Sequence, residues 1–495
     1  MKLKLSALSL AVAALGAASV SAQSLDDLKN QFKQFQREAQ DEYDDFRQRA
    51  NQEYADFMRR AWAQYELLDP VEKPQDDSVE PLVYEGNADD VEIDDGLSTN
   101  ACVNYLSLDM YAPKPKPQPV PIAPIKEYPW PQQAKVDFDY YGTTCTVRYD
   151  DDQEFQLTSL DNDLLADTWL KMSGKEYNNT INDFLGLRNS LKLNDWAYFQ
   201  MLFKFAKQVY GETADEATFL TAYLYAQSGY KMRLLRAGDH LGLLYSSAQT
   251  IFGKPRLREG EYWFYSIDDS FRGIEYMNMA FPNEQALELA LIDEPKLNRN
   301  LSNVRTIQSE RYPDMKVDVN VDKNLIDFFN DYPSFALSDN NLSRWAFYAN
   351  TPLDTEVKKQ LYPQIAQAID GCTPRKAVAK ILNFLQTGLT YKLDEEVWGY
   401  DRPFFAEETL FYPYCDCEDR AILFSHLVRD LVQLPVVLIY YPGHLAAAVD
   451  FGDDGPGDYV TVGDQRYTIT DPTYTRAPVG RSMFAVSKAT ALLLD

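Results

Sequence analysis

The sequence is poor in positive charge. Its 495 residues contain 48 Lys and Arg against 75 Asp and Glu, which gives a formal net charge of −27. Phosphate contacts need clustered Lys and Arg, so this deficit argues against a chain that binds nucleic acid or anionic lipid. A neutral or basic protein or peptide is the partner that this charge favours.

Long apolar runs and cofactor motifs are also missing. After residue 22 no stretch reaches the roughly 18 uninterrupted apolar residues that indicate a membrane-spanning helix. The chain has no zinc-ligand spacing, phosphate loop or dinucleotide fingerprint. We therefore expect no transmembrane segment, no metal and no cofactor.

Cysteines are few and odd in number. Of the five, Cys102 and Cys145 either pair as a disulfide in an oxidising compartment or remain free. The other three, Cys372, Cys415 and Cys417, would then be thiols.

The first 22 residues are typical of a secretory signal peptide. Two lysines precede an Ala/Leu/Val run, which ends in a small-residue cleavage site at Ala22. We expect the protein to be exported to the periplasm or beyond the cell.

Residues 23–68 are expected to form one long amphipathic helix. Aromatic residues recur eleven apart, as at Phe35, Phe46 and Phe57. Eleven residues over three turns keep an apolar stripe nearly straight along a helix. The stripe serves either self-association and partner docking or packing of the helix on its own domain. An acidic and proline-rich linker follows, over residues 69–134.

Three reactive side chains occur late in the chain in a helix, strand, strand pattern. Cys417 opens an apolar-periodic helix, His444 lies between two β-rich runs, and Asp471 ends a short strand. The N-terminus of a helix and a facing imidazolium both lower a thiol pKa, so we expect Cys417 to be largely thiolate. Asp471 would orient His444, and the Cys417 backbone N–H would stabilise an oxyanion.

These residues carry a resemblance. DCEDRAIL, PGHLAAAV and DPTY are similar to the three blocks of the transglutaminase-like superfamily, most closely its secreted bacterial members, and the similarity covers about residues 355–480. The resemblance implies a papain-like catalytic domain over residues 291–495, with Cys417 as nucleophile, His444 as base and Asp471 as orienting acid. Gln386, on a helix expected over residues 374–388, is a weak candidate for a second oxyanion donor. Cys415 stands where the family usually has a small residue.

The middle of the chain, residues 135–290, is a mixed α/β segment. Its order of helix, strand and His-Leu is similar to that of the stretch that contains Cys417 and His444. Aligning His240 with His444 places Thr213 at the position of Cys417, and one further residue of slippage places Asp268 at that of Asp471. Either this segment is a degenerate copy of the catalytic unit that has lost its thiol, or it is an unrelated helix and strand unit. We therefore expect an α+β protein that combines a long N-terminal helix, this middle segment and the C-terminal domain.

The expected chemistry is covalent catalysis on an amide. A Cys417 thiolate would form an acyl-enzyme, and water or a second amine would resolve it, which makes the protein a peptidase-like hydrolase or a transamidase. The alternative is a non-catalytic cell-envelope scaffold that retains the fold and binds partners.

Overall fold

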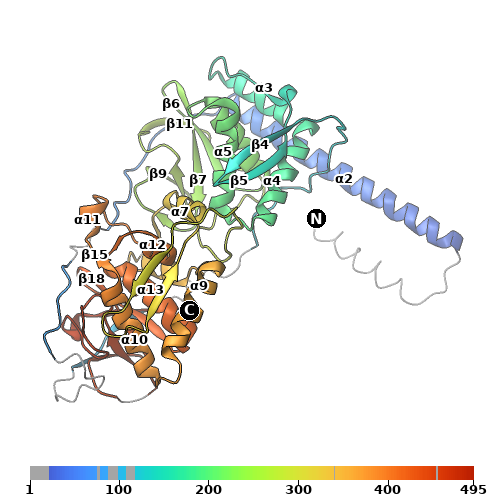
Figure 1. The fold of residues 1–495 in the computed structure, drawn as a ribbon. Coiled ribbons are helices and arrows are strands. Elements are labelled where there is room, and N and C mark those ends of the chain that lie inside the picture. Colours follow the sequence, from blue (N-terminus) through green and yellow to red (C-terminus); the bar gives the residue numbers. More distant parts are fainter. Residues whose placement is uncertain are drawn as a thin grey trace.

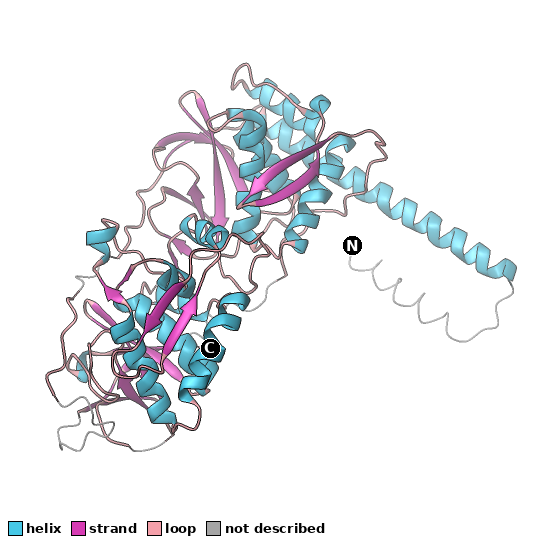
Figure 2. Cartoon of the chain, viewed as in Figure 1, coloured by secondary structure: helices cyan, strands magenta, loops and turns pink. Residues whose placement is uncertain are grey.

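The structure is a computed structural model that describes residues 22–74, 79–86, 99–107, 117–338, 340–452 and 455–494, with side chains from residue 29 onward. All but the last residue of the predicted signal peptide lies outside the described residues. The described chain is an α+β fold with a long N-terminal helix and two curled sheets, which confirms the predicted class (Figures 1 and 2). Among the described residues no helix has both the length and the apolar character to cross a bilayer.

The N-terminal helix α2 (Ala22–Met58) follows the predicted stripe but stops earlier than Leu68. Residues Ala63–Glu66 leave the helix and form strand β1, which pairs with β11. Tyr54 and Met58 are buried, whereas Phe32 and Phe35 are 53% and 44% exposed. The second half of the helix therefore packs on its own chain, and the first half projects away from the body (Figure 1).

The middle part contains a hairpin, four helices and a six-stranded sheet in the order β1-β11-β6-β7-β10-β9. The hairpin turns at Tyr141 and Gly142, both with positive φ, as a two-residue turn between paired strands requires. The elements are β4 (Lys135–Tyr140), β5 (Thr143–Arg148), α3 (Asn162–Met172), α4 (Asn178–Ser190), α5 (Asp195–Tyr210), α6 (Asp215–Gln227), β6 (Met232–Ala237), β7 (His240–Ser247), β8 (Thr250–Ile251), β9 (Arg256–Glu259), β10 (Tyr262–Ser266) and β11 (Gly273–Tyr276).

The C-terminal part packs helices against a seven-stranded sheet in the order β2-β19-β20-β18-β17-β21-β3. Its helices are α7 (Lys323–Asn330), α8 (Ser343–Asn350), α9 (Thr355–Ile369), α10 (Pro374–Gly388), α11 (Asp394–Val397), α12 (Ala406–Phe411) and α13 (Cys417–Leu427). Its strands are β12 (Arg305–Gln308), β13 (Lys316–Val319), β14 (Phe335–Ala336), β15 (Thr390–Tyr391), β16 (Tyr414–Cys415), β17 (Val436–Tyr441), β18 (His444–Val449), β19 (Tyr459–Val462), β20 (Gln465–Thr470) and β21 (Thr490–Leu493).

Helix α13 is buried along its whole length, because it lies between the sheet and helices α8, α10 and α12. Leu445, Ala447 and Val449 on β18 belong to the same apolar core as the helix, and the alternate residues Ala446 and Ala448 belong to a second core on the other face of the sheet. The alternation along β18 therefore gives the sheet two buried faces and places α13 directly against it.

The two sheets share a strand order. In each, a helix is followed by a hairpin, α6 by β6 and β7, and α13 by β17 and β18. The order β11-β6-β7-β10-β9 in the middle part corresponds to β21-β17-β18-β20-β19 in the C-terminal part. His240 and His444 are each the first residue of the second hairpin strand.

The predicted linker contributes two strands to the C-terminal sheet. β2 (Asn100–Cys102) and β3 (Asn104–Leu106) pair in parallel with β19 and β21 of the C-terminal sheet. Further along, Gln118 Nε2 donates to the carbonyl of Leu193 and Ala123 is buried. Residues 75–78, 87–98 and 108–116 of the linker lie outside the described residues.

The disulfide considered for Cys102 and Cys145 is not formed. All five cysteines fall in described residues and are free thiols. Cys102 is on β2 of the C-terminal sheet and Cys145 is on β5 of the middle hairpin, so the fold places the two in separate parts of the chain.

The division of α2 into a packed and a projecting half gives a stability prediction. Tyr54 is buried and stacks on Phe281 at 4.4 Å between ring centroids. Tyr54→Ala is expected to lower the free energy of unfolding by about 3 kcal/mol, because it removes a packed aromatic ring. Phe35→Ala is the matched control and should change it by less than about 0.5 kcal/mol. Urea unfolding of both variants measures this, and equal losses would contradict the packing described.

Candidate active site

Cys417 lies at the first position of α13, behind Asp416 at the N-cap. Here the backbone N–H groups of the first turn have no partner within the helix, and their dipoles point at the side chain. The Leu445 backbone N–H donates a hydrogen bond to Cys417 Sγ at 3.5 Å. The helix start and the start of β18 thus meet at the sulfur, which is 5% exposed.

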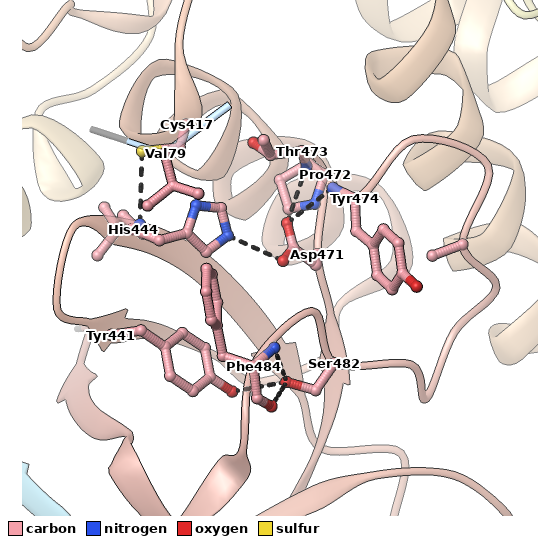
Figure 3. A network of polar contacts seen from close by, with 12 residues as sticks. Val79, Cys417, Tyr441, His444, Asp471, Pro472, Thr473, Tyr474, Ser482 and Phe484 are labelled. Carbon is pink, nitrogen blue, oxygen red and sulfur yellow. Dashed lines mark hydrogen bonds and ion pairs between the residues drawn. The ribbon is translucent and has the colours of Figure 1, made fainter. Parts of the chain in front are cut away.

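His444 and Asp471 form a buried hydrogen bond at the site. His444 Nε2 lies 2.9 Å from Asp471 Oδ2, and both side chains are buried. In Figure 3 the imidazole lies between Cys417 and Asp471. Because a carboxylate accepts, Nε2 is the nitrogen that carries the proton, which leaves Nδ1 as an acceptor. Nδ1 is buried and has no hydrogen-bond partner among the described residues.

The loop after β20 is fixed by side chains from two helices. Asp471 Oδ1 accepts from the backbone N–H groups of Thr473 and Tyr474 at 2.9 and 3.1 Å. Gln386 Nε2, from α10, donates to the carbonyls of Asp471, Tyr474 and Ala477. This corrects the sequence prediction for Gln386, because its amide is used to hold the loop and does not face the sulfur as an oxyanion donor.

Arg420 adds a second brace to the same loop. Its guanidinium is 1% exposed and donates to the carbonyls of Pro472 and Leu389 at 3.4 and 2.8 Å. A buried cation with carbonyl partners at two points ties the Asp471 loop to α13 and to the end of α10. The orientation of Asp471, and through it that of His444, is therefore set by helix side chains.

The thiol itself does not have the predicted thiolate environment. Cys417 Sγ donates to Glu418 Oε2 at 3.0 Å. Burial, and then the nearby carboxylates of Glu418 and Asp416, raise the thiol pKa well above its ordinary value. The described conformation is therefore a neutral thiol turned toward Glu418, and the helix dipole does not outweigh these effects.

Cys415 lies two residues before Cys417 but faces elsewhere. It is buried on β16, which pairs in parallel with β15, and its Sγ contacts the carbonyl oxygen of Thr390 at 3.8 Å. The two cysteines therefore occupy different environments, and only Cys417 faces His444 and the Leu445 N–H.

Five carboxylates surround the start of α13, and four of them are buried. Oxygens of Asp394, Asp416 and Asp419 lie within 4.8 Å of one another, as do those of Asp394, Asp401 and Glu418. The carboxylates of Asp401 and Asp416 each have an oxygen within 4.8 Å of an oxygen of Glu418. One oxygen of each, Oδ1 of Asp401 and of Asp416, accepts no hydrogen bond from the described residues.

Arg344 and Lys73 supply positive charge beside this carboxylate cluster, and Lys73 Nζ donates to the Asp401 carbonyl at 3.1 Å. Arg344 contacts Asp401 at 3.5 Å, and the Phe404 backbone N–H donates to Asp419. Burial, followed by repulsion from Glu418, raises the pKa of Asp394 to about 8 and that of Asp401 to about 7. A buried group of this kind must hold protons or a cation.

Oxygen-only ligands in this number suit a hard divalent cation such as Ca²⁺. No local ligand spacing marks this group in the sequence, because Asp394 opens the short helix α11 and Asp401 follows that helix, well before the DCED motif. The acidic run DEEVWGYD was the available signal.

The three residues predicted for the degenerate copy, Thr213, His240 and Asp268, do not form a site in the middle part. Thr213 is exposed in the turn before α6, and Asp268 bonds Ser270 in an exposed turn. The residue that occupies the place of Cys417 is Asp215: it opens α6, and its Oδ1 accepts from the Leu241 N–H at 2.8 Å, as Cys417 accepts from Leu445. His240 lies 3.8 Å from Asp215 with a largely exposed side chain.

No protein-family model matches the chain, and comparisons with curated proteins and with solved structures give no match.

The carboxylate cluster predicts a stability change with pH. Asp394 and Asp401 keep their protons up to about pH 8 and about pH 7 in the folded state, but lose them near pH 4 when unfolded. The folded state therefore binds more protons, and this contribution to stability is lost as pH rises through those values. Without divalent ions, wild type should lose more stability between about pH 5 and about pH 8 than Asp394→Asn does.

Calcium should reverse that loss. A cation replaces the extra protons, so Ca²⁺ is expected to raise the melting temperature of wild type near pH 8 and to raise that of Asp394→Asn less. Thermal melting with EDTA and with Ca²⁺ measures both effects. Identical pH and Ca²⁺ responses in wild type and Asp394→Asn would show that the cluster binds neither the extra protons nor Ca²⁺.

Proposed function

We propose that the C-terminal part is a transglutaminase-like, papain-like unit and that the protein is an exported cysteine-dependent amide hydrolase or transamidase. The observation that supports this most is the His444–Asp471 hydrogen bond, which leaves Nδ1 without a partner in the described part of the chain. The imidazole lies next to Cys417, at the N-terminus of α13, in Figure 3. A nucleophile, a base and a group that orients the base are the parts that acyl transfer requires. The signal-like residues 1–22 support export to the periplasm or outside the cell.

The chemistry requires the thiol to rotate from Glu418 toward His444. Nδ1 then accepts the thiol proton and the sulfur forms a bond to the amide carbonyl carbon. As the carbon–nitrogen bond breaks, the imidazolium returns that proton to the leaving amine. Water or an amine attacks the thioester, loses its proton to Nδ1, and the sulfur leaves with a proton from the imidazolium.

The carboxylates decide how easily that rotation occurs. Protonation of the cluster or a bound cation would weaken the hold of Glu418 on the sulfur and lower the thiol pKa. The backbone N–H of Cys417, at the helix start, is the group in position to donate to the oxyanion.

We propose further that the middle part is a degenerate copy of this unit. The shared order of five strands and the matching positions of His240 and His444 support it. In that alignment a carboxylate, Asp215, takes the place of the thiol. The copy would then be a non-catalytic platform, because it holds no thiol nucleophile at this position.

A scaffold without turnover is the competing function, and the resting thiol favours it. Cys417 is buried, its pKa is raised and its sulfur bonds Glu418. The projecting residues 29–38 of α2, with exposed Phe32 and Phe35, support self-association or docking of a partner under either function.

Thiol alkylation separates the two functions. If Cys417 is a nucleophile, iodoacetamide labelling at this residue should rise with pH and fall severalfold in His444→Ala. Glu418→Gln should speed labelling at neutral pH, because it removes the carboxylate that raises the thiol pKa. Peptide mass spectrometry assigns the label to each of the five cysteines.

Asn383 lies on the same helix as Gln386 but bonds Ser309 away from the site, so Asn383→Ala is a control for disturbance of α10. Its labelling at Cys417 should match wild type. A rate at Cys417 that is the same in wild type, His444→Ala and Glu418→Gln would support the scaffold and not the enzyme.

A further inference from the structure

A segment from the predicted linker lies beside the candidate active site. Residues 79–86, which we call the strap, run in extended conformation parallel to the chain at Thr475. The Tyr84 N–H donates to the Thr475 carbonyl at 2.9 Å, and the Thr475 N–H donates to the Leu82 carbonyl at 3.0 Å. The Tyr84 ring meets that of Tyr474 edge-on, at 5.8 Å between centroids.

The upstream end of the strap reaches the thiol. The hydroxyl of Tyr391 donates to the Val79 carbonyl at 3.1 Å. Tyr391 pairs with Cys415, two residues before Cys417. Its ring centroid lies 5.2 Å from the guanidinium carbon of Arg420 on α13. Figure 3 accordingly shows Val79 beside Cys417.

The strap therefore spans the site from the nucleophile to the loop of the orienting acid. Its anchors are Tyr391 beside Cys417 at one end and Tyr474 and Thr475, just after Asp471, at the other. Cys417, His444 and Asp471 are all at most 5% exposed under this cover.

We propose that the strap occupies a groove between Tyr391 and Thr475, that this groove is a binding site for an extended peptide, and that the strap is its built-in occupant. The proposal rests on the proposed function, because it assigns a peptide substrate to the same Cys417 site. The strap would compete with that substrate. A peptide substrate would displace the strap and take over its main-chain hydrogen bonds.

The side chains of the strap differ in exposure. Strand addition uses main-chain hydrogen bonds for affinity and selected side chains for specificity. In the strap, Val79, Pro81 and Tyr84 are half-buried, whereas Leu82 and Val83 are 52% and 56% exposed. The site therefore selects an aromatic residue at the Tyr84 position and accepts varied residues at positions 82 and 83.

The strap competes because it is tethered. A segment tethered to its site by the same chain has an effective concentration of the order of millimolar there, so a free peptide of similar affinity occupies the site poorly. Removal of the strap should expose the groove to peptides added in solution and expose Cys417 to alkylation.

The test uses the full chain with residues 79–86 replaced by a Gly/Ser sequence of equal length. The probe is a fluorescent peptide of sequence VEPLVYEG, followed by anisotropy. Binding to this variant is expected to be at least about tenfold tighter than binding to wild type, because the tethered competitor is gone. Equal affinity for the two proteins, or binding to neither, would overturn the proposal.

Two altered peptides test the mode of binding. N-methylation at the Tyr84 nitrogen removes the donor to Thr475 and should weaken binding by about fivefold or more. Leu82→Ser in the peptide changes an exposed side chain and should leave binding unchanged. Equal effects of the two changes would contradict a strand-like mode.

This experiment distinguishes a failure of peptide binding from a failure of catalysis. The anisotropy measurement does not need turnover, so peptide binding by the variant supports the groove even if Cys417 proves unreactive. Should the variant fold poorly by circular dichroism, Tyr84→Ala in the full chain takes its place. That substitution removes one ring contact, and it is expected to increase peptide binding and Cys417 labelling, whereas Leu82→Ala should not.

Discussion

The contact between His444 and Asp471 is the constraint on which the site depends. A buried carboxylate needs donors on both oxygens, and Asp471 obtains them from the imidazole and from two backbone N–H groups of its own loop. That loop is in turn held by Gln386 and Arg420. Helices α10 and α13 and strands β18 and β20 must therefore assemble together, and His444 has its orientation fixed before any substrate arrives.

Around the sulfur the electrostatics oppose reactivity. The helix N-terminus favours an anion, but burial and the carboxylates that flank Cys417 outweigh it. The resting arrangement thus combines an oriented base with a restrained thiol beneath the strap. The carboxylates that restrain the thiol also provide an oxygen-rich position for a proton or a cation. A change in pH or in cation concentration can therefore change the reactivity of the thiol.

Helices whose ends depend on local residues were predicted well from the sequence. Pro374 and Gly388 mark both ends of α10, and the apolar period fixed the start of α13 at Cys417. Long-range pairing was not visible: β1 ends the N-terminal helix early because Ala63–Glu66 pairs with a strand far along the chain. The roles of Gln386 and Asp215, and the approach of Asp394 to the DCED motif, likewise depend on tertiary contacts that no local pattern records.

The position of the ring proton on His444 is the most direct test of the His444–Asp471 contact. With three histidines in the chain, nitrogen-15 labelling of histidine and NMR spectroscopy, with His444→Ala for assignment, would show which ring nitrogen carries hydrogen. We expect the Nε2–H form with an unprotonated Nδ1 in wild type, and a changed histidine spectrum in Asp471→Asn. An Nδ1–H form, or a spectrum unchanged by Asp471→Asn, would contradict it.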